Sequence, residues 1–574
     1  MKIMGYKEEY SAWLAQFSQD EKLVSELSAL TDEKEIEDRF YTDLSFGTAG
    51  MRGVLGFGRN RMNIYTVRRA SFGLADYLLS AGIADAGVVI AYDSRNMSPE
   101  FALESALSLA ARGVKAYLFD SLRPVPVLSY AVRHLGTAAG IVITASHNPP
   151  QYNGYKVYAA DGAQLGPEAA DAVTACIRAL SYFDLTPMSR EEAAEKGLLQ
   201  IVGDKEVDTD YIAMIKSLSL RPELLREKGA SLSIVYTPLH GSGNVPVRRM
   251  LKELGVEQVA VVKEQELPDG NFPTVKAPNP EDPNAFTLAI PLAEKTGATV
   301  VFGTDPDCDR MGVAVKDKQG VFHTLTGNQI GCLLLNHVLT SRQKNGTLPG
   351  NGAAVKSIVS TELARAICKD WGVEMFDVLT GFKFIGEKIQ QFEETGSYEF
   401  LFGFEESFGF LSGTQVRDKD GVNASLLLCE AACAADEDGI TLYDRLQDLF
   451  KKYGYYVEKV VSVTLPGKDG VQKMKDIMAA MRNDPPKAIG SLKVTAVRDY
   501  LAQKKTTADG SEPIDLPKSD VLYFELENGN WICVRPSGTE PKIKLYVNTR
   551  ADSEEAAQSL NEELKAAAQK LVGA

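Results

Sequence analysis

Short apolar runs alternate with amphipathic stretches over most of this sequence, and the alternation restricts the fold more than any other feature. A few apolar residues bounded by polar ones are typical of a buried strand, and apolar residues three and four apart are typical of a helix. Repeated strand-then-helix order predicts mixed or parallel sheets with helices on their faces. The expected strands lie at residues 88–91, 140–144, 232–236, 299–302, 354–359 and 399–402, and expected helices between them at 99–111, 245–254 and 360–371.

The chain has 574 residues, which is too long for one hydrophobic core. At roughly 150 residues per domain it allows three to five domains. The pattern changes past residue 456, where strand-like pieces surround one helical segment and a long Ala/Glu/Lys helix is expected at 553–572. We therefore expect a smaller final α+β domain. Residues 185–196 are interpreted as a linker, and residues 267–284, with five prolines, as an irregular functional loop.

Composition excludes several classes of protein. The formal net charge of −15 argues against nucleic acid or an anionic membrane surface as a partner. The seven cysteines are scattered without a Cys-x-x-Cys pair, which indicates neither a zinc ribbon nor a disulfide framework. Charge near the N-terminus argues against a signal peptide, and the longest apolar stretch, near 424–435, is too short to span a bilayer. We expect a cytoplasmic protein, in which an anionic substrate would need a local basic pocket.

The first candidate site follows the expected strand at 140–144, where the sequence reads Thr-Ala-Ser-His-Asn-Pro. Ser146 offers a hydroxyl beside the imidazole of His147, at the carboxyl end of a strand, where α/β sheets bind ligands. A serine in such a loop is also a common turn residue or helix cap. The glycines of a Gly-x-Ser-x-Gly acyl-hydrolase loop are missing. His147 could activate or orient the hydroxyl, or simply bond the backbone.

Three carboxylates follow the strand at 299–302 and form the second candidate site: Asp305, Asp307 and Asp309. In an extended segment alternate side chains share a face, so these three would converge and repel unless a cation lies between them. Hard oxygen ligands favour Mg²⁺ or Ca²⁺. An EF-hand loop is excluded, because Arg310 and Lys316 stand where it needs Gly and Glu. The alternative is a solvated acidic turn.

Further polar loops end other strands. Arg535-Pro-Ser-Gly-Thr-Glu-Pro combines a Gly-containing turn with a guanidinium and hydroxyls, which is typical of a phosphate site, although an exposed surface turn is the alternative. Glu405 and Ser407 are spaced to point together at a polyol. The loop cations Lys156, Lys383 and Lys419 are each more often solvated charges. Together they would supply the positive field that an anionic substrate needs.

These motifs, in this order, resemble the α-D-phosphohexomutase superfamily. The resemblance covers nearly the whole chain and also includes Gly47-Thr-Ala-Gly-Met-Arg-Gly and Phe404-Glu-Glu-Ser. It implies four domains around a deep cleft, three α/β domains with mixed sheets and a smaller C-terminal α+β domain. The expected bounds are 1–205 for the phosphoserine-bearing domain, 206–322 for the metal-binding domain, 323–455 for the sugar-binding domain and 456–574 for the phosphate-binding domain.

The resemblance also implies roles for individual residues. Ser146 would carry a phosphoryl group, and it would share Mg²⁺ with the three Asp residues. Arg52 and Arg310 would stabilise charge on that group. The candidate proton carriers are Lys156, His147 and Lys419, among which the sequence does not choose. Substrate would be bound by Thr380, Gly381 and Lys383, by Glu405 and Ser407, and by Arg535, Ser537, Gly538 and Thr539.

Residues 144–158 and 379–386 resemble the phosphoglucomutase branch, which also contains phosphopentomutases and bisphosphate synthases. Phosphomannomutases of bacteria are typically shorter and often have a His after the Glu-x-Ser pair, where this chain has Phe408 and Gly409. We expect an intramolecular phosphotransferase of the isomerase class that interconverts glucose 1-phosphate and glucose 6-phosphate, with glucose 1,6-bisphosphate as activator. Mannose and pentose phosphates stay open as substrates, as does the oligomeric state. Rivals of another class are a serine hydrolase or phosphatase and a silent sugar-phosphate sensor.

Overall fold

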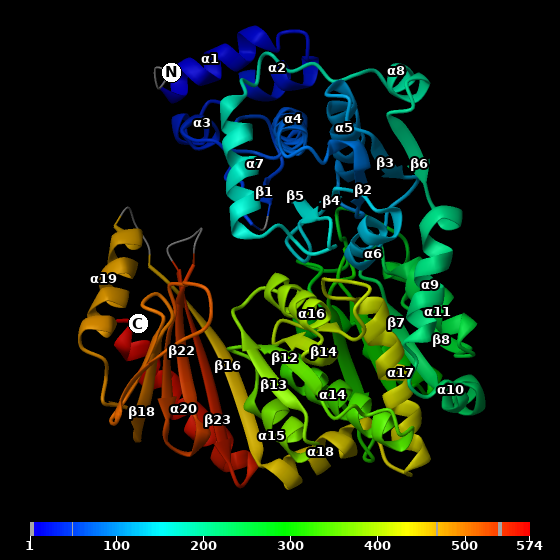
Figure 1. Ribbon diagram of the computed structural model, residues 1–574, viewed down its shortest axis with the longest axis vertical. Coiled ribbons are helices and arrows are strands. Elements are labelled where there is room, and N and C mark those ends of the chain that lie inside the picture. Colours follow the sequence, from blue (N-terminus) through cyan, green and yellow to red (C-terminus); the bar gives the residue numbers. More distant parts are fainter. Residues whose placement is uncertain (1–4, 49, 466–468, 538–541, 574) are drawn as a thin grey trace.

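The computed structural model describes residues 5–48, 50–465, 469–537 and 542–573 (Figure 1). Within these residues there are four sheets, and each takes its strands from one continuous stretch of the chain. Each sheet and the helices that accompany it form one structural unit, numbered in chain order. The first three are mixed sheets with helices on their faces, and the fourth is antiparallel. The expected fold class is therefore confirmed. The exact domain bounds stay a prediction.

The first sheet has the order β1-β5-β4-β2-β3-β6 and carries the loop of Ser146. Its central strand β4 is buried along its whole length, because helices cover both faces of the sheet. The strands are β1 (Met51–Val54), β2 (Val88–Tyr92), β3 (Ala116–Phe119), β4 (Ala139–Ile143), β5 (Tyr152–Ala159) and β6 (Leu199–Val202). The helices around them are α4 (Ile64–Ser80), α5 (Ser98–Ala111), α6 (Val125–Leu135) and α7 (Pro167–Ala179).

Three short helices at the start of the chain pack on this unit around the fully buried Trp13. They are α1 (Tyr6–Gln16), α2 (Glu21–Ser28) and α3 (Glu33–Phe40). The side chains of Asp20 and Asp32 accept hydrogen bonds from the first backbone N–H groups of α2 and α3 and so define where these helices begin. The expected linker at 185–196 contains a short helix, α8 (Arg190–Glu195).

The second sheet has the order β11-β10-β9-β7-β8, and β9 leads into the three Asp residues. Its strands are β7 (Ser233–Thr237), β8 (Gln258–Val261), β9 (Val300–Thr304), β10 (Met311–Lys316) and β11 (Phe322–Thr324). Helices α9 (Thr209–Ser217), α10 (Pro222–Lys228), α11 (Asn244–Glu253), α12 (Lys263–Glu266) and α13 (Ala289–Thr296) belong to the same unit. The loop with five prolines, 267–284, is irregular until the 3₁₀ turn at Pro283–Phe286.

The third sheet has the order β13-β12-β14-β15 and carries Glu405 at the end of β14. Its strands are β12 (Gly352–Ser357), β13 (Glu374–Val378), β14 (Glu399–Glu405) and β15 (Gly409–Leu411). Its helices are α14 (Gly327–Lys344), α15 (Glu362–Asp370), α16 (Lys383–Thr395), α17 (Gly421–Glu437) and α18 (Leu442–Tyr453). One continuous apolar cluster runs from the first unit through the second into the third. These three units therefore share a core.

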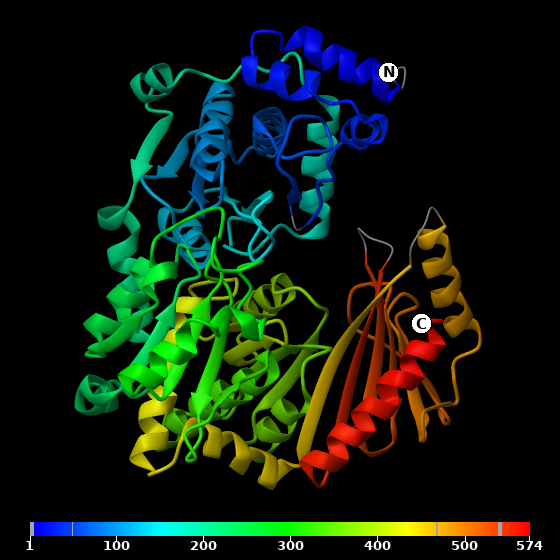
Figure 2. The same ribbon diagram turned by 180° about the vertical axis from the view of Figure 1, so that it is seen from behind.

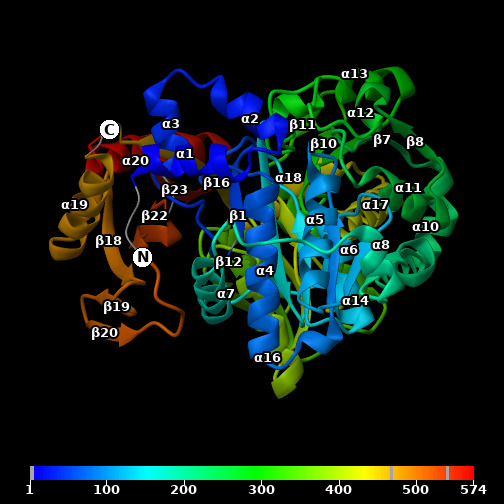
Figure 3. The same ribbon diagram turned by 90° about the horizontal axis from the view of Figure 1, so that it is seen from above.

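The fourth sheet is a separate layer, seen beside the others in Figures 1 and 2 and from above in Figure 3. Its strands are β16 (Tyr455–Thr464), β17 (Ala488–Ile489), β18 (Leu492–Asp499), β19 (Lys504–Thr507), β20 (Gly510–Pro513), β21 (Leu522–Leu526), β22 (Trp531–Pro536) and β23 (Lys542–Ala551). Helices α19 (Gly470–Asn483) and α20 (Glu554–Leu571) complete it. It has a core of its own and meets the third unit through a small cluster that includes Ile358, Leu379 and Trp531.

Among the described residues, no helix is both long enough and apolar enough to cross a membrane.

Candidate active site

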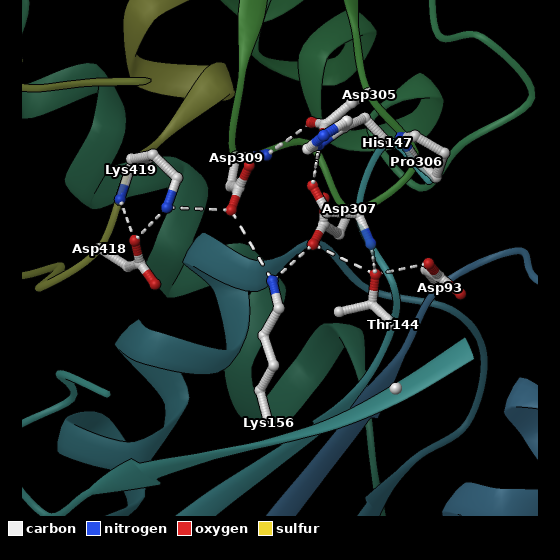
Figure 4. A network of polar contacts seen from close by, with 12 residues as sticks. Asp93, Thr144, His147, Lys156, Asp305, Pro306, Asp307, Asp309, Asp418 and Lys419 are labelled. Carbon is white, nitrogen blue, oxygen red and sulfur yellow. Dashed lines mark hydrogen bonds and ion pairs between the residues drawn. The ribbon is translucent and has the colours of Figure 1, made fainter. Parts of the chain in front are cut away.

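The loops that follow β4 and β9 meet, although about 160 residues of sequence separate them (Figure 4). The Ser146 hydroxyl donates a hydrogen bond to Asp305 Oδ2 at 2.8 Å. His147 Nδ1 lies 3.1 Å from Ser146 Oγ. Ser146 is only 3% exposed. The structure thus places the expected nucleophile and the expected metal site in direct contact.

The Ser146 backbone has a φ of +52°, which a residue other than glycine rarely adopts. Thr144 supports it, because its Oγ1 accepts a hydrogen bond from the Ser146 N–H at 2.8 Å. The same oxygen lies 2.6 Å from Asp93 Oδ2 and 3.2 Å from Asp307 Oδ2. Thr144 therefore links the loop between β4 and β5, called the serine loop (residues 144–151), to the turn that contains the three Asp residues. Neither Asp93 nor this role of Thr144 was predicted from the sequence.

Asp305, Asp307 and Asp309 converge as expected, but the physical reason given from the sequence is wrong. The segment is a tight turn, not an extended strand: Cys308 N donates to Asp305 O at 2.9 Å, and Cys308 has a φ of +52°. One oxygen from each carboxylate lies within 4.8 Å of the others. All three side chains are buried, which excludes the solvated acidic turn.

Two oxygens of this cluster, Asp307 Oδ1 and Asp309 Oδ1, have no hydrogen-bond partner among the described residues. A buried carboxylate oxygen without a partner is costly unless a cation is bound to it. Burial, together with Asp307 and Asp309, raises the pKa of Asp305 well above its ordinary value. For Asp307 burial opposes ionisation, but Lys156, a hydrogen bond with Asp305 and the charge of Lys419 together outweigh it, and the pKa is lowered. The cluster thus fits a hard divalent cation.

Lys156 and Lys419 flank the cluster from two other units (Figure 4). Lys156, on β5, lies 3.0 Å from Asp307 Oδ2 and 3.9 Å from Asp309 Oδ2. Lys419, just before α17, lies 3.1 Å from Asp309 Oδ2 and 2.8 Å from Asp418 Oδ1. Both lysines are buried. Burial lowers and the surrounding carboxylates raise the pKa of Lys419, with a net increase.

Arg52 and Arg310 lie at the edge of the same site. Arg52 donates to Asn148 Oδ1 at 3.1 Å, and Arg310 pairs with Glu281. Glu281 belongs to the irregular loop 267–284, which the sequence marked as functional without identifying this residue. The loop after β7 supports the Asp turn from behind, because Ser242 donates to Pro306 O from both its N–H and its hydroxyl.

A cleft of about 670 Å³ opens beside these residues and is lined by all four units. It brings together eight of the expected residues: Arg52, His147, Arg310, Thr380, Gly381, Glu405, Ser407 and Arg535. Lys383 is not among its described lining residues; it begins α16, with its Nζ 4.9 Å from the centroid of the Phe384 ring. Ser537 follows β22, and Gly538 and Thr539 lie outside the described residues.

Glu405, the last residue of β14, lines the cleft and contacts a second loop. Glu405 Oε1 accepts a hydrogen bond from Gly381 N at 2.6 Å, so the two expected substrate loops touch. Burial and the neighbouring Glu406 raise the pKa of Glu405 to about 7. Gly409 is required here, because a Cβ would lie 2.1 Å from Lys419 Cδ. Gly409 thus leaves room for Lys419, a lysine of the site.

Comparison with known proteins agrees with this geometry. Four domain families match in order: phosphoglucomutase/phosphomannomutase alpha/beta/alpha domain I over residues 43–183, domain II over 209–320, domain III over 326–453, and the C-terminal domain over 461–566. A phosphoglucomutase of Staphylococcus aureus (strain MRSA252) is 40% identical over 540 residues, 92% of this chain and 94% of the relative. The chain belongs to the phosphoglucomutase/phosphomannomutase family.

Further relatives support the membership. A phosphoglucomutase of Staphylococcus saprophyticus is 38% identical over 548 residues, 94% of this chain and 96% of the relative. The crystal structure of a putative phosphomannomutase from Thermus thermophilus is 25% identical, with a TM-score of 0.69 over 93% of this chain and all of that one. The resemblance recognised from the motifs is therefore confirmed.

In this member of the family the cleft also contains charged residues that the sequence did not single out: Glu406, Glu458, Lys459 and Lys544. Glu458 lies on β16, which leads from the third unit into the fourth. Asn548 donates to its Oε1 at 3.2 Å. Burial raises the pKa of Glu458 to about 7 from an ordinary value of 4.5. The sequence of this strand, Tyr-Tyr-Val-Glu-Lys-Val-Val-Ser-Val-Thr, contains no motif that would mark Glu458 as a site residue.

Glu458→Gln should change how stability depends on pH. The native state favours the protonated acid, so wild-type stability falls as the pH rises from about 4.5 to about 7. The side chain is half-buried, which reduces the effect to about 1–2 kcal/mol. As the pH rises from about 5 to about 8, the free energy of unfolding of the variant, measured with urea, should increase by that amount relative to wild type. The exposed Glu394→Gln is the control, and equal pH profiles of Glu458→Gln and wild type would contradict the assignment.

Proposed function

We propose that the protein interconverts glucose 1-phosphate and glucose 6-phosphate by transferring a phosphoryl group to and from Ser146. The observation that carries this proposal is the contact between Ser146 and Asp305 inside a buried carboxylate cluster. A serine hydrolase would need no such cluster. Relatives about 40% identical over most of the chain are named phosphoglucomutases, which favours glucose. The substrate would be a small sugar phosphate.

The reaction begins with a phosphoryl group on Ser146 and a sugar monophosphate in the cleft. The free sugar hydroxyl attacks phosphorus, the bond to Ser146 Oγ breaks, and a 1,6-bisphosphate forms. The bisphosphate turns end for end and returns its other phosphoryl group to Ser146. Throughout, one phosphate must be anchored while the other reacts. Arg535, which lines the cleft from β22 of the fourth sheet, is proposed as that anchor.

Asp305, Asp307 and Asp309 would hold Mg²⁺ together with the phosphoryl group on Ser146. When bound, Mg²⁺ would neutralise charge on the transferring group. Arg310 and Arg52, which both line the cleft, are proposed to contact the phosphoryl oxygens. The attacking hydroxyl must lose a proton, and Lys156, His147 and Lys419 are the titratable candidates. A neutral imidazole is available, because burial lowers the pKa of His147 to about 2.

Glu405 and Ser407 are proposed to hold sugar hydroxyls, and glucose 1,6-bisphosphate is proposed to prime Ser146. A cytoplasmic location is also proposed. It is supported by seven free cysteines, six of them buried, which a reducing compartment would preserve.

Glucose and mannose differ only at C2, so the loop with Glu405 and Ser407 should discriminate between them modestly. Ribose phosphate is smaller and would leave polar groups unpaired, at about 1–3 kcal/mol per group.

A coupled assay with glucose 1-phosphate, mannose 1-phosphate and ribose 1-phosphate, each with and without glucose 1,6-bisphosphate, tests the proposal. We expect the highest kcat/KM with glucose 1-phosphate and stimulation by the bisphosphate. A higher kcat/KM with ribose 1-phosphate would indicate a phosphopentomutase. Release of inorganic phosphate without isomerisation would indicate a phosphatase, and binding without turnover would indicate a sensor.

Ser146→Ala should abolish turnover while the protein stays folded. The hydroxyl is the acceptor of the phosphoryl group, and its hydrogen bond to Asp305 contributes only about 1 kcal/mol to stability. Intact-mass measurement after incubation with glucose 1,6-bisphosphate should show one phosphate on wild type and none on the variant. Normal turnover by Ser146→Ala would rule out the covalent route.

Mg²⁺ should raise the melting temperature of wild type, because a ligand that binds only the native state stabilises it. Asp309→Asn removes one of the three charges that hold the ion and should lose this response together with activity. The control is Asp317→Asn, which alters a carboxylate of the same unit that pairs with His323 instead. An unchanged rate after complete removal of divalent cations by EDTA would contradict the metal assignment.

A further inference from the structure

Arg95 holds the backbone of the serine loop from beneath. Its guanidinium donates hydrogen bonds to four carbonyl oxygens: Nη1 to Pro149 O and Tyr152 O, each at 3.0 Å, and Nη2 to Ser146 O and Asn148 O. The Arg95 side chain is completely buried. One planar group thus fixes the loop at both its beginning and its end.

The position of Arg95 is itself determined by neighbours on two units. Asp93 Oδ2 lies 3.4 Å from Arg95 Nε, and Asp93 Oδ1 accepts a hydrogen bond from Arg95 N at 2.9 Å. The ring of Phe272 covers the guanidinium, with its centroid 5.0 Å from Cζ. Phe272 is fully buried and belongs to loop 267–284 of the second unit. At Gly270 in the same loop, a Cβ would lie 2.4 Å from Asn96 N.

The serine loop needs such a support. Ser146 is held in a left-handed conformation, which costs of order 1–3 kcal/mol and persists only where the surroundings enforce it. Thr144 fixes the Ser146 N–H, and Arg95 fixes the Ser146 carbonyl, so both sides of the residue are bound. Its hydroxyl is thereby aimed at Asp305. A displacement of about 1 Å at such a position can reduce the rate about a hundredfold.

We propose that Arg95 is a positioning residue for phosphoryl transfer: it holds Ser146 in its reactive orientation and transmits to it the packing of loop 267–284. The proposal rests on the proposed role of Ser146 as phosphoryl acceptor. Arg95 contacts residues 146–152 only through their backbone carbonyl oxygens, so we expect it to affect the transfer step and not the binding of substrate. Lysine cannot replace it, because a single ammonium lacks the planar fork that reaches four acceptors.

The test compares Arg95→Lys with Arg69→Lys. Arg69 is a matched control in the same unit: it is 6% exposed, it pairs with Asp43, and its Nε donates to Ile177 O and Leu180 O, each at 3.0 Å. None of these three partners belongs to the serine loop. For each variant we would measure the melting temperature, kcat and KM for glucose 1-phosphate, and the rate at which glucose 1,6-bisphosphate phosphorylates Ser146, followed by intact mass.

Arg95→Lys should lower kcat and the rate of Ser146 phosphorylation about tenfold or more, while KM stays within about threefold. Arg69→Lys should leave both rates near wild type even where its melting temperature falls. Equal losses in the two variants, or a normal phosphorylation rate in Arg95→Lys, would overturn the proposal. Failure of wild type to take up phosphate would instead refute the role of Ser146.

A second variant keeps the test valid if Arg95→Lys does not fold. Phe272→Leu removes the ring above the guanidinium but keeps an apolar side chain there, and it changes none of the residues whose carbonyl oxygens Arg95 contacts. Its kcat should fall about threefold or more with KM unchanged, because the guanidinium loses its cover. Wild-type values of both kcat and the phosphorylation rate in Phe272→Leu would overturn the inferred link from loop 267–284.

Discussion

Three carboxylates buried within 4.8 Å of one another are the constraint on which the rest of the structure depends. Like charges at a buried site repel strongly, so the fold must supply opposite charge there. It does so from different parts of the chain: Lys156 lies on β5 of the first sheet, and Lys419 lies in the loop just before α17. Removing either lysine would leave a buried charge without compensation, which costs more than a surface ion pair contributes. The contact between the first three units is thus centred on charge and enclosed by their shared apolar cluster.

The cleft shows how a chain with a net charge of −15 can accept an anion. Its described lining includes five cationic side chains, Arg52, Arg310, Lys459, Arg535 and Lys544, beside four carboxyl groups, Glu281, Glu405, Glu406 and Glu458. Burial raises the pKa of Glu405 and of Glu458 to about 7, so these two carry less negative charge at neutral pH than exposed acids would. At neutral pH this lining therefore has more cationic side chains than fully ionised acids.

Much of the fold and part of the site could be predicted from the sequence, for definable physical reasons. The strand at 139–143 is continuously apolar because both faces of its sheet are covered. The motif that follows it therefore lies at the carboxyl end of a central strand, where such sheets bind ligands. Asp93, Arg95 and Glu281 gave no comparable signal, because their importance comes from tertiary contacts with residues far away in the sequence. The prediction that the three Asp residues lie in an extended segment was wrong, because Pro306 and Cys308 belong to a turn. The spacing of the Asp residues alone does not reveal that turn.

Loop 267–284 connects the two halves of the chemistry without contributing a regular element over most of its length. Phe272 covers Arg95 under the serine loop, and Glu281 pairs with Arg310 at the cleft. Five prolines restrict its backbone, which lowers the entropy lost when an irregular segment becomes ordered. The same loop therefore contacts both Arg95, which binds the backbone around Ser146, and Arg310, which lines the cleft. Arg535 lies on the fourth sheet, which has its own core and a smaller apolar contact to the third unit. In the proposed mechanism the bisphosphate turns between two transfers, and this division would let the phosphate grip of Arg535 yield while the geometry around Ser146 stays fixed.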